Sequence, residues 1–245
     1  MKYYRLQFTL NSKYYGSKNG YVKDYIHKSS INDPKFIGKI KNEKIDFKPY
    51  LLDIEIFENS KIADLIESGG QVSTKLILSG KLKSIIEKHR KTGMQFFNIN
   101  ILQKKNVHTD YWILNMYEFN LEFINFKECI VYHEKKSEDY STTYKTENII
   151  INPKSYIEFL KYREEAQENM EMVKIEKLSI LDSIDENFFM LKHVLGGIGY
   201  FVSETLKKEI EDAGCTGIEF QPVELSYNEW TAPGGVREQV YGKYF

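Results

Sequence analysis

The side chains best suited to hold a metal or attack a substrate in this sequence are five histidines and two cysteines. They are His27, His89, His108, His133, His193, Cys129 and Cys215. No histidine pair has HExxH or HxxxH spacing, and the cysteines form no CxxC. The sequence also lacks a GxSxG nucleophile elbow and a GxGxxG or P-loop phosphate motif. We therefore predict no catalytic residues, no metal and no cofactor. A catalytic set assembled from scattered residues is the alternative.

Charge is balanced over the whole chain but not along it. The 34 Lys and Arg and the 35 Asp and Glu give a net charge of −1, yet residues 1–50 carry eleven bases and four acids. Such a stretch can bind nucleic acid. Its bases are dispersed lysines apart from Arg5, whereas arginine dominates phosphate and base recognition. We therefore interpret residues 1–50 as a solvated face and do not expect nucleic acid as a partner.

Composition indicates a folded globular protein. Apolar residues make up 42% and charged residues 28%, which excludes general disorder, a collagen repeat and a coiled-coil rod. No apolar run approaches the roughly 20 residues of a membrane span, and the start of the chain lacks a signal-peptide core. Two distant cysteines are typical of reduced thiols, so we expect a cytoplasmic location.

Hydrophobic periodicity outlines the elements that must position any functional residue. Strands are expected over about 2–10, 51–57, 76–78, 95–102, 111–119, 121–132, 188–194, 200–202 and 218–223. Helices are expected over about 61–67, 82–91, 154–172 and 204–213. Residues 11–49 read as irregular, and the polar run 133–147 reads as a surface or working loop.

Two stretches of the sequence match each other. Residues 79–97 align without gaps to residues 203–221, with eight identities in nineteen positions. Each copy reads as strand, Ser cap, helix, Thr-Gly turn, strand. Caps, apolar stripes and turn glycines recur in any such unit, but the shared Thr-Gly-x-x-Phe is harder to explain by convergence. We interpret the match as a duplicated unit within one fold.

These elements predict an α+β fold with a mainly antiparallel sheet, a few helices and a duplicated strand–helix–strand unit. A length of 245 residues fits one large domain. Two lobes, at about 1–105 and 106–245, are the alternative division.

A series of motifs along the chain resembles a known bacterial family. The chain opens with Met-Lys-Tyr-Tyr-Arg-Leu, continues through the Asp64 region and the helix after Ser79, and has a Tyr/Asp-rich middle. It then reads Val-Ser-Glu-Thr-Leu-Lys over 202–207 and Thr-Gly-Ile-Glu-Phe over 216–220. In this order the motifs resemble immunity protein family eleven, first catalogued as a domain of unknown function. The resemblance is sharpest over about 200–223.

The resemblance implies a non-catalytic protein, encoded beside a polymorphic toxin, that neutralises this toxin by binding it. Its partner would be the cognate protein toxin, with no membrane and no small-molecule substrate. The alternative from another class is a hydrolase or transferase acting on a nucleotide or a modified protein. A neighbouring gene for a large secreted toxin favours immunity, whereas a metabolic operon favours an enzyme.

The most acidic part of the chain is the expected docking surface. Residues 185–245 carry ten acids and five bases, and an acidic surface would be steered to the basic site of a toxin that attacks nucleic acid. The same stretch holds Tyr and Trp, which are enriched at binding hot spots. The predicted partner-binding residues are Glu209, Glu211, Asp212, Tyr227 and Trp230. Alternatively, the acids form a solvated helix face, the aromatic tail packs on its own sheet, and the toxin docks on 133–147 or 1–50.

Overall fold

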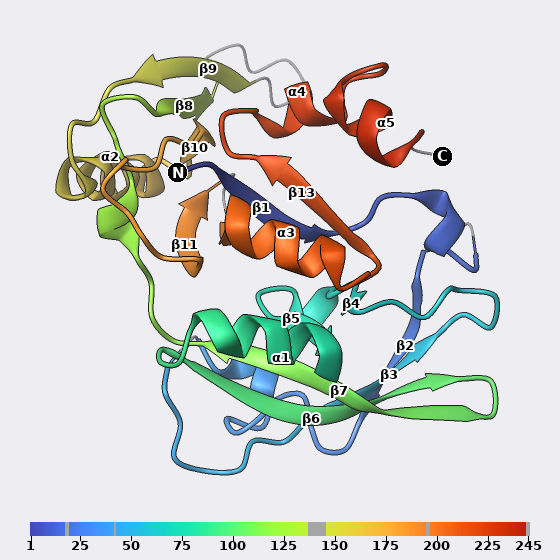
Figure 1. Cartoon of the computed structure of the whole chain (residues 1–245). Helices are drawn as coiled ribbons and strands as arrows, with labels where there is room; N and C mark the ends of the chain where they lie inside the picture. The colour runs from blue at the N-terminus through green and yellow to red at the C-terminus, as the bar shows by residue number, and fades with distance from the viewer. Residues whose placement is uncertain (18–19, 42, 137–145, 195–196, 244–245) are drawn as a thin grey trace.

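The computed structural model describes residues 1–17, 20–41, 43–136, 146–194 and 197–243. Within these ranges the chain forms 13 strands in two mixed, largely antiparallel sheets, together with five α-helices (Figure 1). The predicted α+β class is confirmed, with two sheets in place of the single sheet that the sequence suggested.

The larger sheet has seven strands in the order β13-β1-β12-β11-β10-β8-β9. These strands are β1 (Tyr3–Phe8), β8 (Ile130–Lys136), β9 (Thr146–Ile151), β10 (Met172–Lys177), β11 (Phe188–Val194), β12 (Gly197–Ser203) and β13 (Ile218–Pro222). Neighbouring strands pair antiparallel except β10 with β11. The N-terminal strand β1 lies between β12 and β13, so this sheet joins the start of the chain to its last third.

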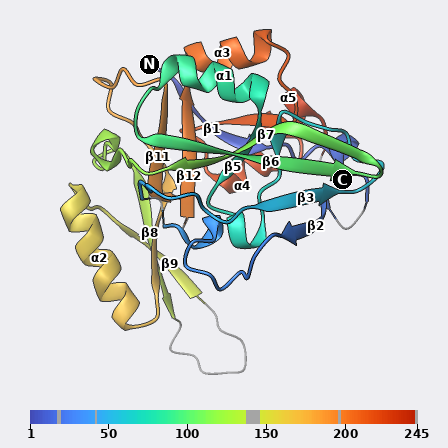
Figure 2. The same cartoon turned by 90° about the horizontal axis from the view of Figure 1, so that it is seen from below.

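The smaller sheet has six strands in the order β2-β3-β6-β7-β5-β4. These are β2 (Val22–His27), β3 (Leu52–Ile56), β4 (Leu65–Ile66), β5 (Leu76–Ser79), β6 (Met94–Gln103) and β7 (Asn106–Met116). β6 and β7 form a long hairpin, and β3 pairs with β6 in parallel. The helices are α1 (Gly80–His89), α2 (Tyr156–Glu168), α3 (Glu204–Asp212), α4 (Tyr227–Thr231) and α5 (Val236–Tyr241). Figure 2 shows α1 and α3 side by side and α2 on a distant part of the molecule.

The duplicated unit is present in both sheets. In each copy a serine caps the helix: the Ser79 hydroxyl accepts a hydrogen bond from the Leu82 backbone N–H, and the Ser203 hydroxyl accepts one from that of Leu206. Caps of this kind satisfy N–H groups that the first helical turn leaves without partners. The turn glycine that follows each helix has φ near +78°, a region open to glycine without steric cost.

The equivalence extends beyond the repeat in the sequence. β6-β7-β5-β4 in the smaller sheet corresponds to β13-β1-β12-β11 in the larger one. Tyr111 pairs with Ser79 as Tyr3 pairs with Ser203, so β7 and β1 occupy the same place in the same register. In the first unit the central strand follows β6 directly. In the second unit it comes from the N-terminus.

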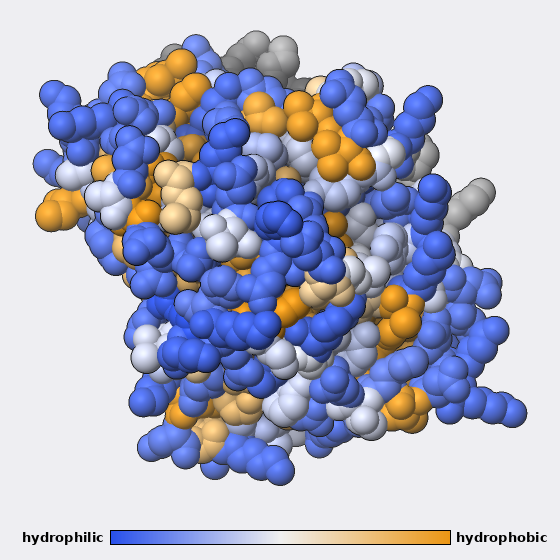
Figure 3. Space-filling view, viewed as in Figure 1, coloured by the Kyte–Doolittle hydropathy of each residue, from blue (hydrophilic) through white to orange (hydrophobic). Residues whose placement is uncertain are grey.

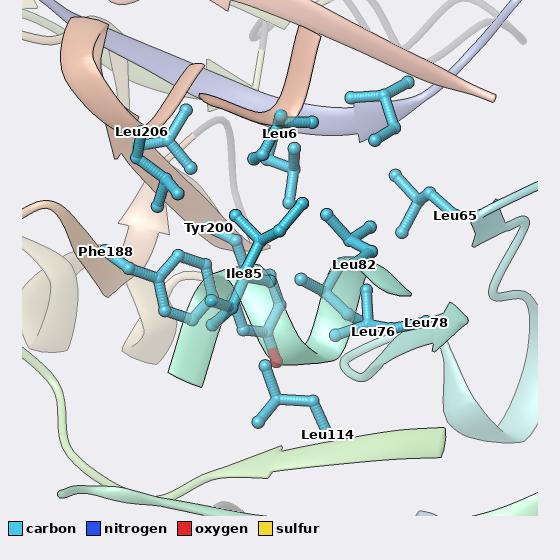
Figure 4. Packing of buried hydrophobic residues seen from close by; sticks show 14 of the residues in the cluster. Leu6, Leu65, Leu76, Leu78, Leu82, Ile85, Leu114, Phe188, Tyr200 and Leu206 are labelled. Carbon is cyan, nitrogen blue, oxygen red and sulfur yellow. The ribbon is translucent and has the colours of Figure 1, made fainter. Parts of the chain in front are cut away.

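A shared hydrophobic core lies between the two units. Leu82 and Ile85 of α1 and Leu206 of α3 point toward Leu6 and Phe188 of the larger sheet (Figure 4). Leu82, Phe188 and Leu206 are 0% exposed. Each such side chain contributes about 1.5–3 kcal/mol by leaving water. A second core lies on the other face of the smaller sheet, and a third lies between α2 and the larger sheet.

Several expected elements are corrected by the structure. The helix expected over 61–67 is wrong: Leu65 and Ile66 form strand β4, which pairs with β5. The irregular stretch 11–49 contains strand β2. In the run 121–132, residues 121–123 form a 3-10 turn and a strand begins only at Ile130. These segments are short, and periodicity does not separate helix from strand over so few residues.

The polar run 133–147 begins and ends in strands. Residues 133–136 belong to β8 and residues 146–147 to β9, whereas residues 137–145 lie outside the described part of the chain. The lobes proposed at 1–105 and 106–245 do not follow the sheets, because β1 joins the larger sheet and β7 the smaller one. The division into one domain or two lobes stays a prediction. Among the described residues, no helix is long and apolar enough to span a membrane.

Candidate functional site

The three predicted acids lie on α3, and each already has a basic partner. Glu209 accepts hydrogen bonds from Lys88 Nζ and His89 Nε2 of α1, both at 2.7 Å. The Lys88 bond, together with that from His89, lowers the pKa of the Glu209 carboxyl. Glu209 therefore connects the two repeat helices. His89 and Lys88 are the partners of Glu209 on α1.

Glu211 and Asp212 lie at the C-terminal end of α3 and are open to solvent. Glu211 pairs with Lys207 and Asp212 with Lys208, each one helical turn earlier on the same helix. Exposed pairs at this spacing contribute only a few tenths of a kcal/mol and yield readily to another charge. Figure 3 shows that the face over α1 and α3 is mostly hydrophilic. Of the three acids, Glu211 and Asp212 have the more exposed side chains.

The two predicted aromatic residues lie on α4 and differ in exposure. Tyr227 is 41% exposed, whereas Trp230 is 1% exposed and packs edge-on against Tyr241. Trp230 is therefore packed inside the protein. This agrees with the alternative interpretation, in which the aromatic tail packs on its own sheet. The more distant tail residue Tyr244 lies outside the described residues.

The acids and the aromatic residues face opposite sides of the larger sheet. On β13, Ile218 and Phe220 belong to the core beneath α3, whereas Glu219 faces Arg237 of α5. Because side chains alternate along a strand, α3 and the α4–α5 segment cover different faces. Glu211 and Tyr227 therefore do not form one continuous surface. Their role in binding a partner stays a prediction.

A groove beside α1 contains an aromatic residue that the sequence analysis did not select. Lys83 Nζ lies 4.8 Å from the centre of the Trp112 ring and 4.9 Å from that of Phe96, and its ammonium pairs with Glu87. The groove is lined by Lys83, Glu87, Arg90, Lys91, Met94, Gln95, Phe96 and Trp112. A partly exposed Trp beside cations is a common anchor for protein binding.

The internal repeat of the sequence contains a feature from which this groove could have been predicted. In the second unit Lys207 lies over the rings of Tyr4 and Phe220, at 5.3 and 5.4 Å from their centres. The Lys83/Lys207 and Phe96/Phe220 identities of the repeat therefore mark a lysine held between two rings. Trp112 occupies the place of Tyr4, on the strand that the repeat in the sequence does not include.

The cysteines are poorly placed for nucleophilic chemistry. Burial raises the pKa of both the Cys129 and the Cys215 thiol to about 11, so each is protonated at neutral pH. Both are free thiols. Within the described residues, no group of three or more His, Cys, Asp or Glu side chains is arranged to hold a metal.

Comparison with known families gives one match. The family model described as Immunity protein family (Imm11) matches residues 30–225, about four fifths of the chain. Glu209, Glu211 and Asp212 lie inside the matched range, and Tyr227 and Trp230 lie beyond it. The chain matches none of the curated proteins with which it was compared.

Proposed function

The chain belongs to the Immunity protein family (Imm11), and on this premise we propose that it binds a cognate toxin and neutralises it without catalysing a reaction. The match over residues 30–225 is the observation that carries the proposal. It covers both repeat helices, which Glu209 connects through its contacts with Lys88 and His89. We place the interaction in the cytoplasm during competition between bacteria, in keeping with the two free thiols.

We further propose that the toxin docks on the acidic end of α3. Among the described residues, Glu211 and Asp212 pair with lysines of their own helix, and both carboxylates are exposed to a basic partner. Complementary charge accelerates association and excludes partners of the wrong sign. Glu209, on the same helix, connects α3 to α1, and we propose Tyr227 as a separate contact on the other side of the larger sheet.

A protection assay with the toxin from the neighbouring gene tests the docking surface. The double variant Glu211→Lys, Asp212→Lys reverses the charge at the end of α3 and leaves the α1–α3 connection intact. We expect at least a tenfold loss of toxin affinity, mainly through slower association. The matched control is Glu164→Lys, Glu165→Lys, which makes the same charge change on exposed positions of α2. Equal protection by both folded variants would show that the toxin docks elsewhere.

Tyr227→Ala tests the second contact separately, because its side chain is exposed and its removal leaves Trp230 in place. A folded Tyr227→Ala protein with lower toxin affinity places α4 in the interface. If the co-expressed toxin is not bound by the parent protein at all, the immunity function itself is refuted.

A further inference from the structure

A cleft lies between the two sheets where β1 and β12 separate. Among the described residues the two strands pair as far as Leu6 with Tyr200, and β1 continues beyond this pair to Phe8. The opening encloses about 200 Å³. Arg5, Gln7, Glu67, Ser68, Ser73 and Ile198 are among the residues that line it. This volume suits a small ligand or a single side chain of a partner.

Arg5 enters this cleft as a cation without an acid. Over the described residues its guanidinium donates one long hydrogen bond, 3.4 Å from Nη2 to the Ile198 carbonyl oxygen, and forms no ion pair. Loss of hydration lowers its pKa. A desolvated charge is costly unless it is paired, so a guanidinium in this state fits a site completed by something else.

Gln7 provides a second donor without a partner. Its Nε2 is buried and makes no hydrogen bond with any of the described residues. It follows Arg5 by two residues on β1, so both side chains lie on the same face of the strand, about 7 Å apart. An amide N–H left unpaired away from water costs about 1–3 kcal/mol.

In the first unit, the residues equivalent to Arg5 and Gln7 are satisfied by contacts within the protein. The register makes Ile113 and Asn115 of β7 the equivalents of Arg5 and Gln7. Ile113 is apolar and 0% exposed. Asn115 accepts a hydrogen bond from Lys75 and donates to the Glu43 carbonyl oxygen. The second unit has a cation and an unsatisfied donor at the same two places.

We propose that this cleft is an oxyanion-binding site, taking a carboxylate or phosphate group between the guanidinium of Arg5 and the amide of Gln7. The planar fork of arginine matches two oxygens of such a group. Glu67 also lines the cleft, but among the described residues it forms no ion pair with Arg5. The site is separate from the acidic end of α3, so it goes beyond the proposed toxin binding.

Phosphate binding to the full chain tests the site without the toxin. Inorganic phosphate is titrated by the broadening of its ³¹P resonance, with acetate as a competitor and chloride holding the ionic strength constant. We expect Arg5→Gln to weaken phosphate at least about tenfold, because a charge-assisted bond is lost. Glu67→Gln strengthens it by removing a negative charge from the cleft. Arg163→Gln, an arginine change on α2, leaves it unaltered.

The stability of the unliganded variants separates a binding role from a structural one. A partly buried guanidinium with one long hydrogen bond contributes little to stability, so Arg5→Gln should have an unfolding midpoint in urea equal to or higher than that of the parent. A clear fall in the midpoint would assign Arg5 to the structure and overturn the proposal. Unchanged phosphate binding by folded Arg5→Gln would also overturn it.

The source of the oxyanion follows from the protection assay. If folded Arg5→Gln protects as well as the parent and has lost phosphate binding, the ligand is a free small anion. If protection falls too, and phosphate competes with toxin binding to the parent, a carboxylate of the toxin occupies the cleft.

Discussion

Trp230 and Tyr227 share one helix yet have opposite environments. Trp230 is 1% exposed, and Tyr227 is 41% exposed. We expect Trp230→Ala to lower the free energy of unfolding by about 3–5 kcal/mol through the cavity it leaves. Tyr227→Ala should cost less than about 1 kcal/mol, because surface changes remove little packing. Urea denaturation of both variants measures the difference. Similar losses in the two would contradict the placement of α4.

Lys75 is a buried cation with a shifted titration. It is 1% exposed and donates to the Ile40 carbonyl oxygen and to Asn115 Oδ1, at 3.0 and 2.7 Å. Burial lowers its pKa from 10.5 to about 8. Between these values the unfolded chain binds more protons than the folded protein, so the free energy of unfolding rises with pH across this window.

The Lys75 contribution is measured against Lys75→Met. Between pH 8 and 10.5 the parent should gain up to about 3 kcal/mol relative to the variant. Tyrosines that titrate in the same range cancel in the difference. Urea midpoints at several pH values give both curves. Parallel curves would show that Lys75 has an ordinary pKa.

At the scale of elements, the two repeat helices depend on the same capping chemistry. The Ser79 hydroxyl also donates to Asp64 at 2.6 Å, and that of Ser203 donates to Asn187 at 2.5 Å. We expect Ser79→Ala and Ser203→Ala each to cost about 1–2 kcal/mol, and to agree within about 0.5 kcal/mol. Ser84→Ala is the matched control on the exposed face of α1. A large cost at one cap alone would mean that the two units are not energetically equivalent.

At the scale of the whole molecule, a buried ion pair joins distant parts of the chain. Glu219 accepts two hydrogen bonds from Arg237, at 2.8 and 2.7 Å, and two more from Thr9 Oγ1 and the Leu10 N–H. The exposed side-chain fractions of Arg237 and Glu219 are 1% and 0%. The pair therefore connects the N-terminal segment, β13 and α5.

Breaking this pair should be far worse than replacing it. Arg237→Met leaves a buried carboxylate without its cation, so we expect a loss of about 3–5 kcal/mol in the free energy of unfolding. The double variant Glu219→Gln, Arg237→Met removes the uncompensated charge and should recover part of this loss. Thermal and urea unfolding of both proteins measure it. A double variant less stable than the single one would show that the charge on Glu219 matters beyond this pair.

Interactions between residues close together in the sequence determined where the helices of the two repeated units begin. Ser79 and Ser203 cap their helices because the hydroxyl reaches an N–H three residues later, whatever the rest of the chain does. Leu206 and Ile210 lie one turn apart on α3, and both are buried, as the apolar stripe of an amphipathic helix should be. These signals span a few residues each. The family resemblance rested on the same motifs, and the match over 30–225 confirms it.

Only the tertiary structure determined which strands complete each unit and which side chains stay accessible. Alternation along β1 predicts a strand but not its neighbours, and its partners lie about 200 residues away. The insertion of β1 beside β12 places Arg5 in the cleft, and the packing of α4 on the sheet buries Trp230 while Trp112 stays partly exposed. Residue type alone does not separate these two tryptophans. Burial depends on which surfaces meet, and contacts between distant segments determine that.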